Sequence, residues 1–255
     1  MATSVLGIPL FDEGLEAAVA FTVETCVNGR ARESRLVSAS DAHCLVLARK
    51  DAQFKAILES FYWNLPDGVP SVWISRLKGA RRVGRCYGPD FFEAVMRQSA
   101  DKSIRHFLCG GKRGVANELA DICSTKFGNR NCVGSYSPGF DIESEQELKE
   151  IGMTVNDANT DILWIGMSSP RQHFFAKRLA RHLNAHFIVT VGAAFDFHTG
   201  RVKHAPAFVQ KLGLEWFYRI LVEPGRLGPR YFQVVPLFIY YAIIDIARHW
   251  GKRKG

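Results

Sequence analysis

The sequence lacks the short motifs that are typical of a metal centre or a bound dinucleotide. Its six cysteines are scattered, with no Cys-x-x-Cys pair and no metal-ligand spacing. It contains no Asp-x-Asp, and its Gly-rich turn, Gly110-Gly111 with Gly114, matches neither a Walker loop nor the dinucleotide fingerprint. We therefore expect reduced thiols in the core, no metal and no cofactor.

Targeting and spacer patterns are also missing. The apolar run at residues 5–10 is too short for a secretory signal, and no basic residue precedes it. No low-complexity run, internal repeat or linker interrupts the chain. With 255 residues, 47% of them hydrophobic, the chain can bury a sizeable core. We expect one large domain or two lobes, located in the cytosol.

Negative charge is scarce in the last third of the chain. Residues 171–255 carry 14 Lys and Arg against 4 Asp and Glu, whereas residues 1–170 carry 19 against 21. The net charge of +8 is therefore concentrated near the C-terminus. A basic surface of this kind suits nucleic acid, a nucleotide diphosphate or an anionic membrane.

Residues 161–200 form the clearest structural unit in the sequence. An apolar run typical of a buried parallel strand ends at Gly166, and Pro170 suits the first turn of the helix that follows. A second apolar strand is predicted at residues 187–191. Such units bind anions beyond the carboxyl ends of their strands. We therefore expect residues 166–172 and 192–200 to lie side by side on one rim.

Predicted strands and helices alternate through the rest of the chain. The expected strands are residues 4–10, 36–37, 103–108 and 131–136. The expected helices are residues 13–27, 44–50, 51–61, 89–99, 115–127 and 144–156. This alternation predicts an α/β fold with a mainly parallel sheet flanked by helices.

Polar residues in three turns are candidates for chemistry. Asp67 lies in a Pro-Asp-Gly turn between two apolar runs, where it is either a general base or an ordinary turn residue. Asp41 and His43 follow a short strand and are either helix-capping residues or ligands. The basic loop at residues 78–88, which includes Arg85, is either a solvated face or a phosphate contact.

The C-terminal segment changes character after Gly200. Residues 206–222 predict one amphipathic helix, with Pro224 stopping it. Residues 234–247 are apolar and aromatic, but these fourteen residues are too few to span a membrane. Together with the basic residues that follow, they indicate either a helix in a membrane interface or a helix docked on the core or on another subunit.

Several stretches, in order along nearly the whole chain, carry a family resemblance. They are Asn64-Leu-Pro-Asp-Gly68, Tyr87-Gly-Pro-Asp90, Gly110-Gly111 with Gly114, Ile162-Leu-Trp-Ile-Gly-Met-Ser-Ser-Pro-Arg-Gln172, Val191-Gly-Ala-Ala-Phe-Asp-Phe197 and Gly213-Leu-Glu-Trp216 with Arg219, Arg226 and Arg230. On these residues the chain resembles the WecG/TagA/CpsF family of bacterial glycosyltransferases.

The resemblance implies a fold and an activity. The fold would be a Rossmann-like core at residues 1–200, with a helical appendage at residues 201–255 that meets the membrane and completes the active site. The activity would be inverting, metal-independent transfer of a sugar from a UDP-sugar to a polyprenyl-diphosphate-linked saccharide in cell-surface polysaccharide biosynthesis. The enzyme would be peripheral on the anionic cytoplasmic face of the bacterial inner membrane, with homo-oligomers possible and no nucleic-acid partner.

The same resemblance implies roles for individual residues. Asp67 would be the catalytic base. The nucleotide-sugar pocket would contain Gly110, Gly111, Gly166, Ser168, Pro170, Gln172, Gly192, Phe195 and Asp196. The acceptor or its diphosphate would contact Asp41, His43, Arg85, Asp90, Arg219, Arg226 and Arg230. Many relatives have Thr-x-Asn where this chain has Ala39-Ser-Asp41, so the resemblance does not predict which sugar is transferred.

Two other functions fit parts of the sequence. A soluble nucleotide-binding oxidoreductase would explain the alternating strands and the Gly-Gly turn, but the dinucleotide fingerprint is missing. A nucleic-acid-binding protein would use the basic last third and its aromatic residues to stack bases. Against this second alternative, an apolar series at helical spacing predicts a buried helix face rather than a stacking surface, at Phe208, Leu212, Trp216 and Ile220.

Overall fold

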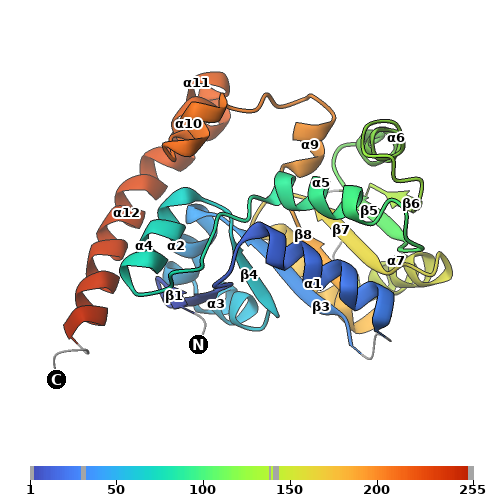
Figure 1. Cartoon of the computed structure of the whole chain (residues 1–255), viewed down its shortest axis with the longest axis horizontal. Helices are drawn as coiled ribbons and strands as arrows, with labels where there is room; N and C mark the ends of the chain where they lie inside the picture. The colour runs from blue at the N-terminus through green and yellow to red at the C-terminus, as the bar shows by residue number, and fades with distance from the viewer. Residues whose placement is uncertain (1–2, 30–32, 138, 140–143, 252–255) are drawn as a thin grey trace.

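A six-stranded sheet forms the centre of the computed structural model, which describes residues 3–29, 33–137, 139 and 144–251 (Figure 1). The strand order is β4-β3-β8-β7-β5-β6, and neighbouring strands pair in parallel. The strands are β3 (Arg35–Ser40), β4 (Trp63–Pro66), β5 (His106–Gly110), β6 (Cys132–Tyr136), β7 (Ile162–Gly166) and β8 (Phe187–Thr190). The predicted α/β fold with a parallel sheet is confirmed.

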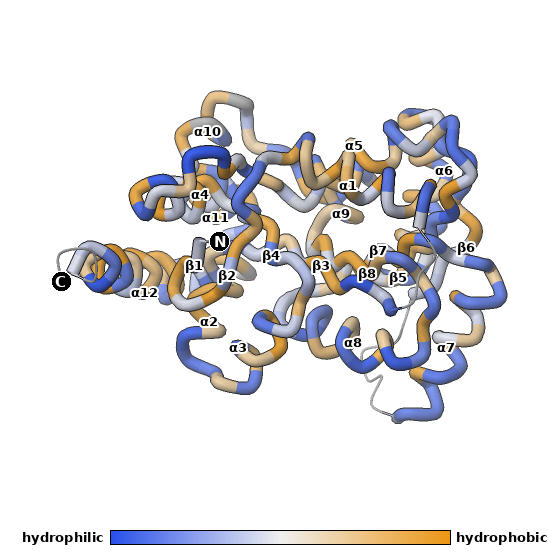
Figure 2. Tube along the Cα trace, turned by 60° about the horizontal axis from the view of Figure 1, so that its bottom comes forward, coloured by the Kyte–Doolittle hydropathy of each residue, from blue (hydrophilic) through white to orange (hydrophobic). Residues whose placement is uncertain are grey.

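Helices cover both faces of the sheet, as Figure 2 shows. One face is covered by α1 (Leu15–Asn28), α5 (Gly88–Gln98), α6 (Val115–Lys126) and the short α9 (Ala194–His198). The other face is covered by α3 (Ala52–Glu59), α7 (Glu145–Asp157) and α8 (Arg171–Leu179), with the 3₁₀ turn η1 (Ala180–His182) after it.

Strand β7 shows why the central strands are apolar throughout. Side chains alternate across a strand, so Trp164 packs under the first helical layer and Leu163 and Ile165 pack under the second. All three side chains have no exposed surface. A strand buried on both faces therefore appears in the sequence as a continuous apolar run.

A third apolar cluster lies beside the sheet and includes the N-terminal hairpin. The predicted single strand at residues 4–10 is wrong, because the chain reverses at Leu6 and Gly7, both of which have positive φ. The result is an antiparallel pair that packs with neighbouring helices. These elements are β1 (Thr3–Val5), β2 (Ile8–Leu10), α2 (Ala42–Lys50), α4 (Val69–Leu77) and α12 (Pro224–Gly251).

The predicted helix at residues 206–222 is two helices, α10 (Ala207–Lys211) and α11 (Glu215–Val222). Gly213, with φ of 70°, breaks the helical path between them. The break also disrupts the expected buried face, since Phe208 and Leu212 are 67% and 58% exposed. The prediction that Phe208 and Leu212 belong to a buried helix face is therefore wrong.

Helix α12 is much longer than the predicted apolar segment at residues 234–247, whose fourteen residues are too few to span a membrane. It runs for 28 residues through Pro229 and Pro236, and its Leu227–Gly251 segment is long and apolar enough to cross a membrane by length and composition. Its inner face nevertheless packs on the core through Val234, Phe238 and Ala242. Asp245 on the same helix accepts a hydrogen bond from Lys78 Nζ at 2.9 Å.

Candidate active site

The candidate residues gather at the carboxyl ends of the parallel strands, where α/β proteins bind ligands. Asp41 directly follows β3, and Asp67 directly follows the neighbouring strand β4. Glycines mark the same edge at the ends of β5 and β7 and after β8, at Gly110, Gly166 and Gly192. These five sequence-predicted residues therefore share one rim, although each belongs to or follows a different strand.

A small cavity of about 100 Å³ lies where this rim meets the C-terminal helices. Its core walls come from the turns after β3 and β4 and from the segment before α5, including Asp41, His43, Asp67, Arg85 and Tyr87. Its other walls come from the α10–α12 region, namely Gln210, Gly213, Glu215, Trp216, Arg219 and Tyr231. The C-terminal helices thus complete a cavity that the parallel sheet begins.

Asp67 is the carboxyl group at the cavity whose surroundings raise its pKa toward neutrality. Burial, together with the nearby Asp41 carboxylate, raises the pKa of Asp67 to about 7, although Arg85 and the Gly88 N–H oppose the rise. Gly88 N–H donates to Asp67 Oδ1 at 2.7 Å and fixes the direction of the carboxylate. A carboxyl group with a pKa near neutrality is suited to accept a proton from a substrate.

Asp41 has a structural role in addition to its place at the cavity. It caps α2, because its Oδ1 accepts from Cys44 N–H at 2.9 Å. Burial acts to raise the pKa of Asp41, but His43, the Cys44 N–H and Arg230 together hold it below its ordinary value. Asp41 is therefore a fixed negative charge, and this charge helps to keep a proton on Asp67.

Arg85 connects the Asp67 turn to the C-terminal helices. Its Nε donates to the Asp67 carbonyl oxygen at 2.9 Å, and its guanidinium lies 4.1 Å from the centroid of the Tyr87 ring. On the other side it donates to Gln210 Oε1 at 3.3 Å and pairs with Glu215. Arg81 and Arg82, in the same predicted basic loop, are exposed and do not line the cavity.

Two further arginines approach the rim from the C-terminal helices. Arg219 lines the cavity and stacks over Phe197, with Cζ 5.4 Å from the ring centroid. Arg230 donates from Nη2 to the Ser169 carbonyl oxygen at 3.2 Å, so it lies against the loop after β7. The side chain of Arg226, which the resemblance also implicates, lies outside the described part of the structure.

Among the described residues, the buried polar atoms at this cavity that have no hydrogen-bond partner include Arg219 Nε, His43 Nδ1 and Tyr87 Oη. Burial lowers the pKa of His43, which favours the neutral imidazole despite the opposing charge of Asp41. Buried polar groups are normally paired, so unpaired ones that face a cavity indicate ligand contacts.

The expected adjacency of residues 166–172 and 192–200 is observed. Strands β7 and β8 are neighbours, and Gln172 Oε1 accepts from Gly192 N–H at 3.0 Å. Gln172 Nε2 also donates to Ser169 Oγ at 3.2 Å, while Ser168 remains exposed on the rim. Pro170 occupies the N-cap position of α8, and Asp196 is half-buried in α9 beside this loop.

Some candidate residues have a structural explanation that needs no ligand. A Cβ on Gly110 would lie 2.4 Å from the Gly166 carbonyl oxygen, so β5 and β7 approach each other too closely for any side chain there. A Cβ on Gly111 would lie 2.8 Å from the Val115 side chain. Phe195 is 1% exposed and packs against Gly166 inside the core. Asp90 is exposed at the start of α5, outside the lining of the cavity.

Several lining residues were assigned no site role from the sequence, among them Gln210, Glu215 and Tyr231. Glu215 had a usable signal, because it is one of four acidic residues in the basic last third. An isolated carboxylate among arginines often marks an ion pair. Tyr231 stands next to Arg230 in the stretch that carries the family resemblance, whereas Gln210 had no comparable signal, since only the packing of the C-terminal helices brings it to the rim.

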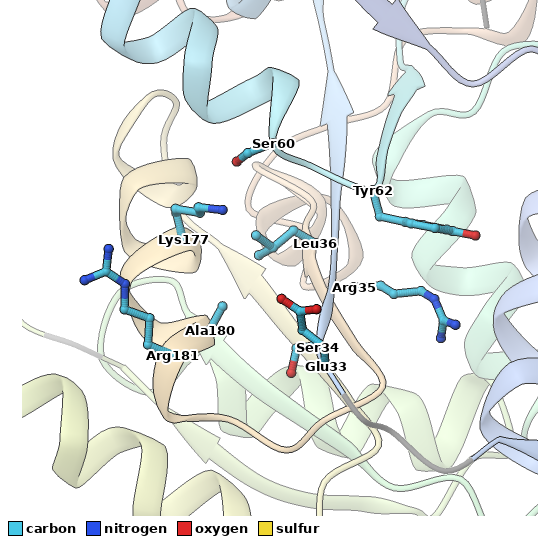
Figure 3. Close-up of a pocket in the computed structure, with 9 residues that line it drawn as sticks. All are labelled: Glu33, Ser34, Arg35, Leu36, Ser60, Tyr62, Lys177, Ala180 and Arg181. Atoms are coloured by element: carbon cyan, nitrogen blue, oxygen red, sulfur yellow. The ribbon is translucent and has the colours of Figure 1, made fainter. Parts of the chain in front are cut away.

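A larger cavity, of about 680 Å³, lies at the opposite end of β3 (Figure 3). Its lining includes Arg35, Tyr62, Lys177 and Arg181. Figure 3 shows Arg35 and Tyr62 pointing away from Lys177 and Arg181, so these polar groups do not converge on one point. This cavity also lies at the amino ends of the strands, and it is a weaker candidate for catalysis.

Comparison with known proteins decides the family. The model of the glycosyl transferase WecG/TagA/CpsF family matches residues 3–252. The chain belongs to this family. The family assignment confirms the sequence resemblance and favours a glycosyltransferase over the oxidoreductase and nucleic-acid-binding alternatives.

Two bacterial relatives within the WecG/TagA/CpsF family are similar over most of their length. Both are named N-acetylglucosaminyldiphosphoundecaprenol N-acetyl-beta-D-mannosaminyltransferase. The protein from Bacillus subtilis (strain 168) is 31% identical over 192 residues, covering 75% of this chain and 73% of the relative. The protein from Bacillus spizizenii is 30% identical over 180 residues, covering 70% and 68%.

Proposed function

We propose that the protein transfers an N-acetylhexosamine from its UDP conjugate to a sugar linked to polyprenyl diphosphate. The observation that carries the proposal is the position of Asp67, a half-buried carboxyl group whose pKa is raised to about 7, in a cavity that also contains two arginines. The names of the two Bacillus relatives support a lipid-diphosphate-linked acceptor and an aminosugar product.

The proposed reaction is a single displacement. An acceptor hydroxyl gives its proton to Asp67 while its oxygen bonds to the anomeric carbon of the donor, and the bond from that carbon to the phosphate oxygen breaks. The hydroxyl attacks the face opposite the bond that breaks, and UDP leaves with the bonding electrons, so the anomeric configuration inverts. One base is sufficient for this step, and such proton transfer contributes roughly 100-fold to 10,000-fold.

Positive side chains are available to balance the charge that develops on the leaving diphosphate. Arg85 and Arg219 line the cavity, and Arg230 lies against the neighbouring loop. Guanidinium groups hold phosphate oxygens in two places, which suits this task. The described residues contain no cluster of three His, Cys, Asp or Glu side chains with metal-site geometry. Metal-independent transfer, with arginines balancing the charge in place of a divalent cation, is part of the proposal.

The size of the cavity implies that the C-terminal helices move during turnover. A volume of about 100 Å³ is smaller than the roughly 300–1,000 Å³ that bound small molecules usually occupy. The helices contribute Gln210, Glu215 and Trp216 to the cavity wall. Displacement of α10 and α11 would admit the donor, and their return would enclose it.

The proposed location is the cytoplasmic face of the inner membrane, with α12 lying on the surface. The inner face of α12 is packed, and Asp245 pairs with the buried Lys78, so the docked helix cannot cross the bilayer. The outer face carries apolar residues at helical spacing, and Ile239, Ile243 and Trp250 are 54%, 63% and 50% exposed. An apolar face of this kind suits an interfacial helix.

The decisive experiment is an assay with a panel of UDP-sugars and a short-chain lipid-diphosphate N-acetylglucosamine. We expect mass spectrometry to show the addition of one N-acetylhexosamine and NMR to show an inverted anomeric configuration. Addition of a metal chelator should leave the rate unchanged. A product with retained configuration, or no product with any donor, would contradict the proposal.

A further inference from the structure

An apolar groove of about 690 Å³ runs between α11 and the first half of α12. It contains no charged side chain among the residues that line it. Its lining residues are Trp216, Phe217, Ile220, Gly228, Pro229, Tyr231, Phe232, Gln233, Val235 and Pro236. Phe217 is 50% exposed and Phe232 is 85% exposed, an unusual degree for such large apolar side chains. Apolar surface that is left open in this way indicates a binding role.

The groove adjoins the candidate active site. Trp216 and Tyr231 line both the groove and the cavity that contains Asp67, and their ring centroids are 6.2 Å apart. Arg219 lines the cavity side of this aromatic pair. A ligand with a charged head and an apolar tail could therefore place its head at Arg219 and its tail in the groove.

We propose that this groove binds the first isoprenyl units of the acceptor, next to the diphosphate. The inference rests on the proposed function, because it assigns a position to the lipid part of that acceptor. The shared aromatic wall, Trp216 and Tyr231, places the groove next to the cavity and favours the acceptor chain over membrane acyl chains. The exposed Ile239, Ile243 and Trp250, which lie further along α12, are better placed to meet the membrane itself.

A direct binding measurement tests the groove without requiring turnover. Farnesyl diphosphate and dimethylallyl diphosphate share a diphosphate head but differ by two isoprenyl units. Calorimetric titration of each ligand into the full chain, with no membrane present, isolates the contribution of the chain. Partial burial of the extra units predicts that farnesyl diphosphate binds at least about tenfold more tightly. Equal affinities for the two ligands would overturn the proposal.

Variants connect the chain preference to the groove. Phe217→Ser combined with Phe232→Ser removes two exposed lining rings, so the tenfold preference should fall below about threefold. Leu221→Ser is the matched control, because Leu221 is 65% exposed on the same helix α11 but does not line the groove. This control should keep the full preference. If the double variant also keeps it, the groove is not the binding site.

A filling variant gives a second, independent result. A Cβ at Gly228 would meet no atom within 4 Å, so Gly228→Leu can place its side chain in the groove without a backbone clash. It should weaken farnesyl diphosphate binding and leave dimethylallyl diphosphate binding unchanged. Equal weakening of both ligands would contradict a site for the chain.

Two further measurements distinguish acceptor binding in the groove from membrane binding there and from the proposed sugar-transfer reaction. Sedimentation with anionic vesicles measures membrane binding. If the double variant loses vesicle binding but keeps the preference for farnesyl diphosphate, the groove contacts the membrane and does not bind the acceptor chain. The sugar-transfer assay reports the proposed function. A preference for farnesyl diphosphate in a protein that transfers no sugar would support the groove and refute only the proposed reaction.

Discussion

Arg85 Nη2 lies 2.5 Å from Glu215 Oε2, and this ion pair joins the parallel-sheet core to α11. The two side chains are 20% and 13% exposed, so the pair is largely shielded from solvent. Because Arg85 also donates to the carbonyl oxygen of Asp67, the position of the C-terminal helices is coupled to the turn that carries the proposed base.

Loss of this pair should loosen the C-terminal helices. Glu215→Gln leaves the charge of Arg85 without its partner. Removal of one member of a buried ion pair typically lowers the free energy of unfolding by about 3–5 kcal/mol. We expect faster tryptic cleavage at Arg201 and Lys203, before α10, and a reduced kcat/KM. Glu59→Gln, which breaks the exposed pair with Lys55, should change neither measurement. Unchanged cleavage in Glu215→Gln would show that the pair does not hold the helices.

Replacement of the proposed base should stop the chemistry but not binding. Asp67→Asn keeps the shape of the side chain and cannot accept the proton, so kcat should fall roughly 100-fold to 10,000-fold. The affinity for UDP, measured by calorimetry, should stay within about twofold of the wild type. The exposed Asp101→Asn serves as the control. Near-normal turnover in Asp67→Asn would remove Asp67 from the mechanism.

The rate should depend on pH through Asp67. Its carboxylate is the active form and its pKa is raised to about 7, so kcat/KM should rise as pH increases through 7 and become constant above that region. The Asp41 charge contributes to this raised pKa. Asp41→Asn should therefore move the midpoint of the profile to lower pH. A kcat/KM that stays constant from about pH 5 to about pH 9 would contradict the assignment of Asp67 as the base, because a group with a pKa near 7 changes its protonation within that range.

The pair between Lys78 and Asp245 should stabilise the docked position of α12. Asp245 Oδ2 also accepts from Leu6 N–H at 3.0 Å, and Lys78 donates to the Ser4 carbonyl oxygen at 2.6 Å. Asp245→Ala leaves the buried Lys78 without its counter-charge, and we expect unfolding by urea to show a loss of about 3–5 kcal/mol. Asp245→Asn should lose less, because it keeps a hydrogen-bond acceptor. Equal stability of wild type and Asp245→Ala would mean that α12 is not held there.

The central part of the fold was predictable because burial shapes the sequence directly. Strand β7 is apolar on both faces, and Gly166 with Pro170 beyond it marks its C-terminal end. Strand β3 was predicted far too short, at residues 36–37, because Ser38 and Ser40 appear polar. Both are fully buried, and their hydroxyls hydrogen-bond each other at 2.9 Å and bond to His173 and Asn64. Only a three-dimensional network shows that such serines belong to a core strand.

The candidate site was predictable from chemistry only in part. Asp67 stands out as a carboxylate between apolar runs, which the structure resolves into β4 and α4. Its raised pKa depends on Asp41 from another strand, and that proximity cannot be obtained from sequence spacing. In the same way, Gly213 divides one predicted helix into two and thereby brings Glu215 to Arg85.

The narrowness of the space around Asp67 bears on how the protein handles its donor when no acceptor is present. A cavity of about 100 Å³ leaves bulk solvent little access to the carboxyl group while α10 and α11 are in place. Water is itself a nucleophile, and a base open to it would destroy activated sugar. Under the proposed function, the fitted walls would protect the donor from hydrolysis, and hydrolysis of the donor without acceptor should increase when those walls are loosened.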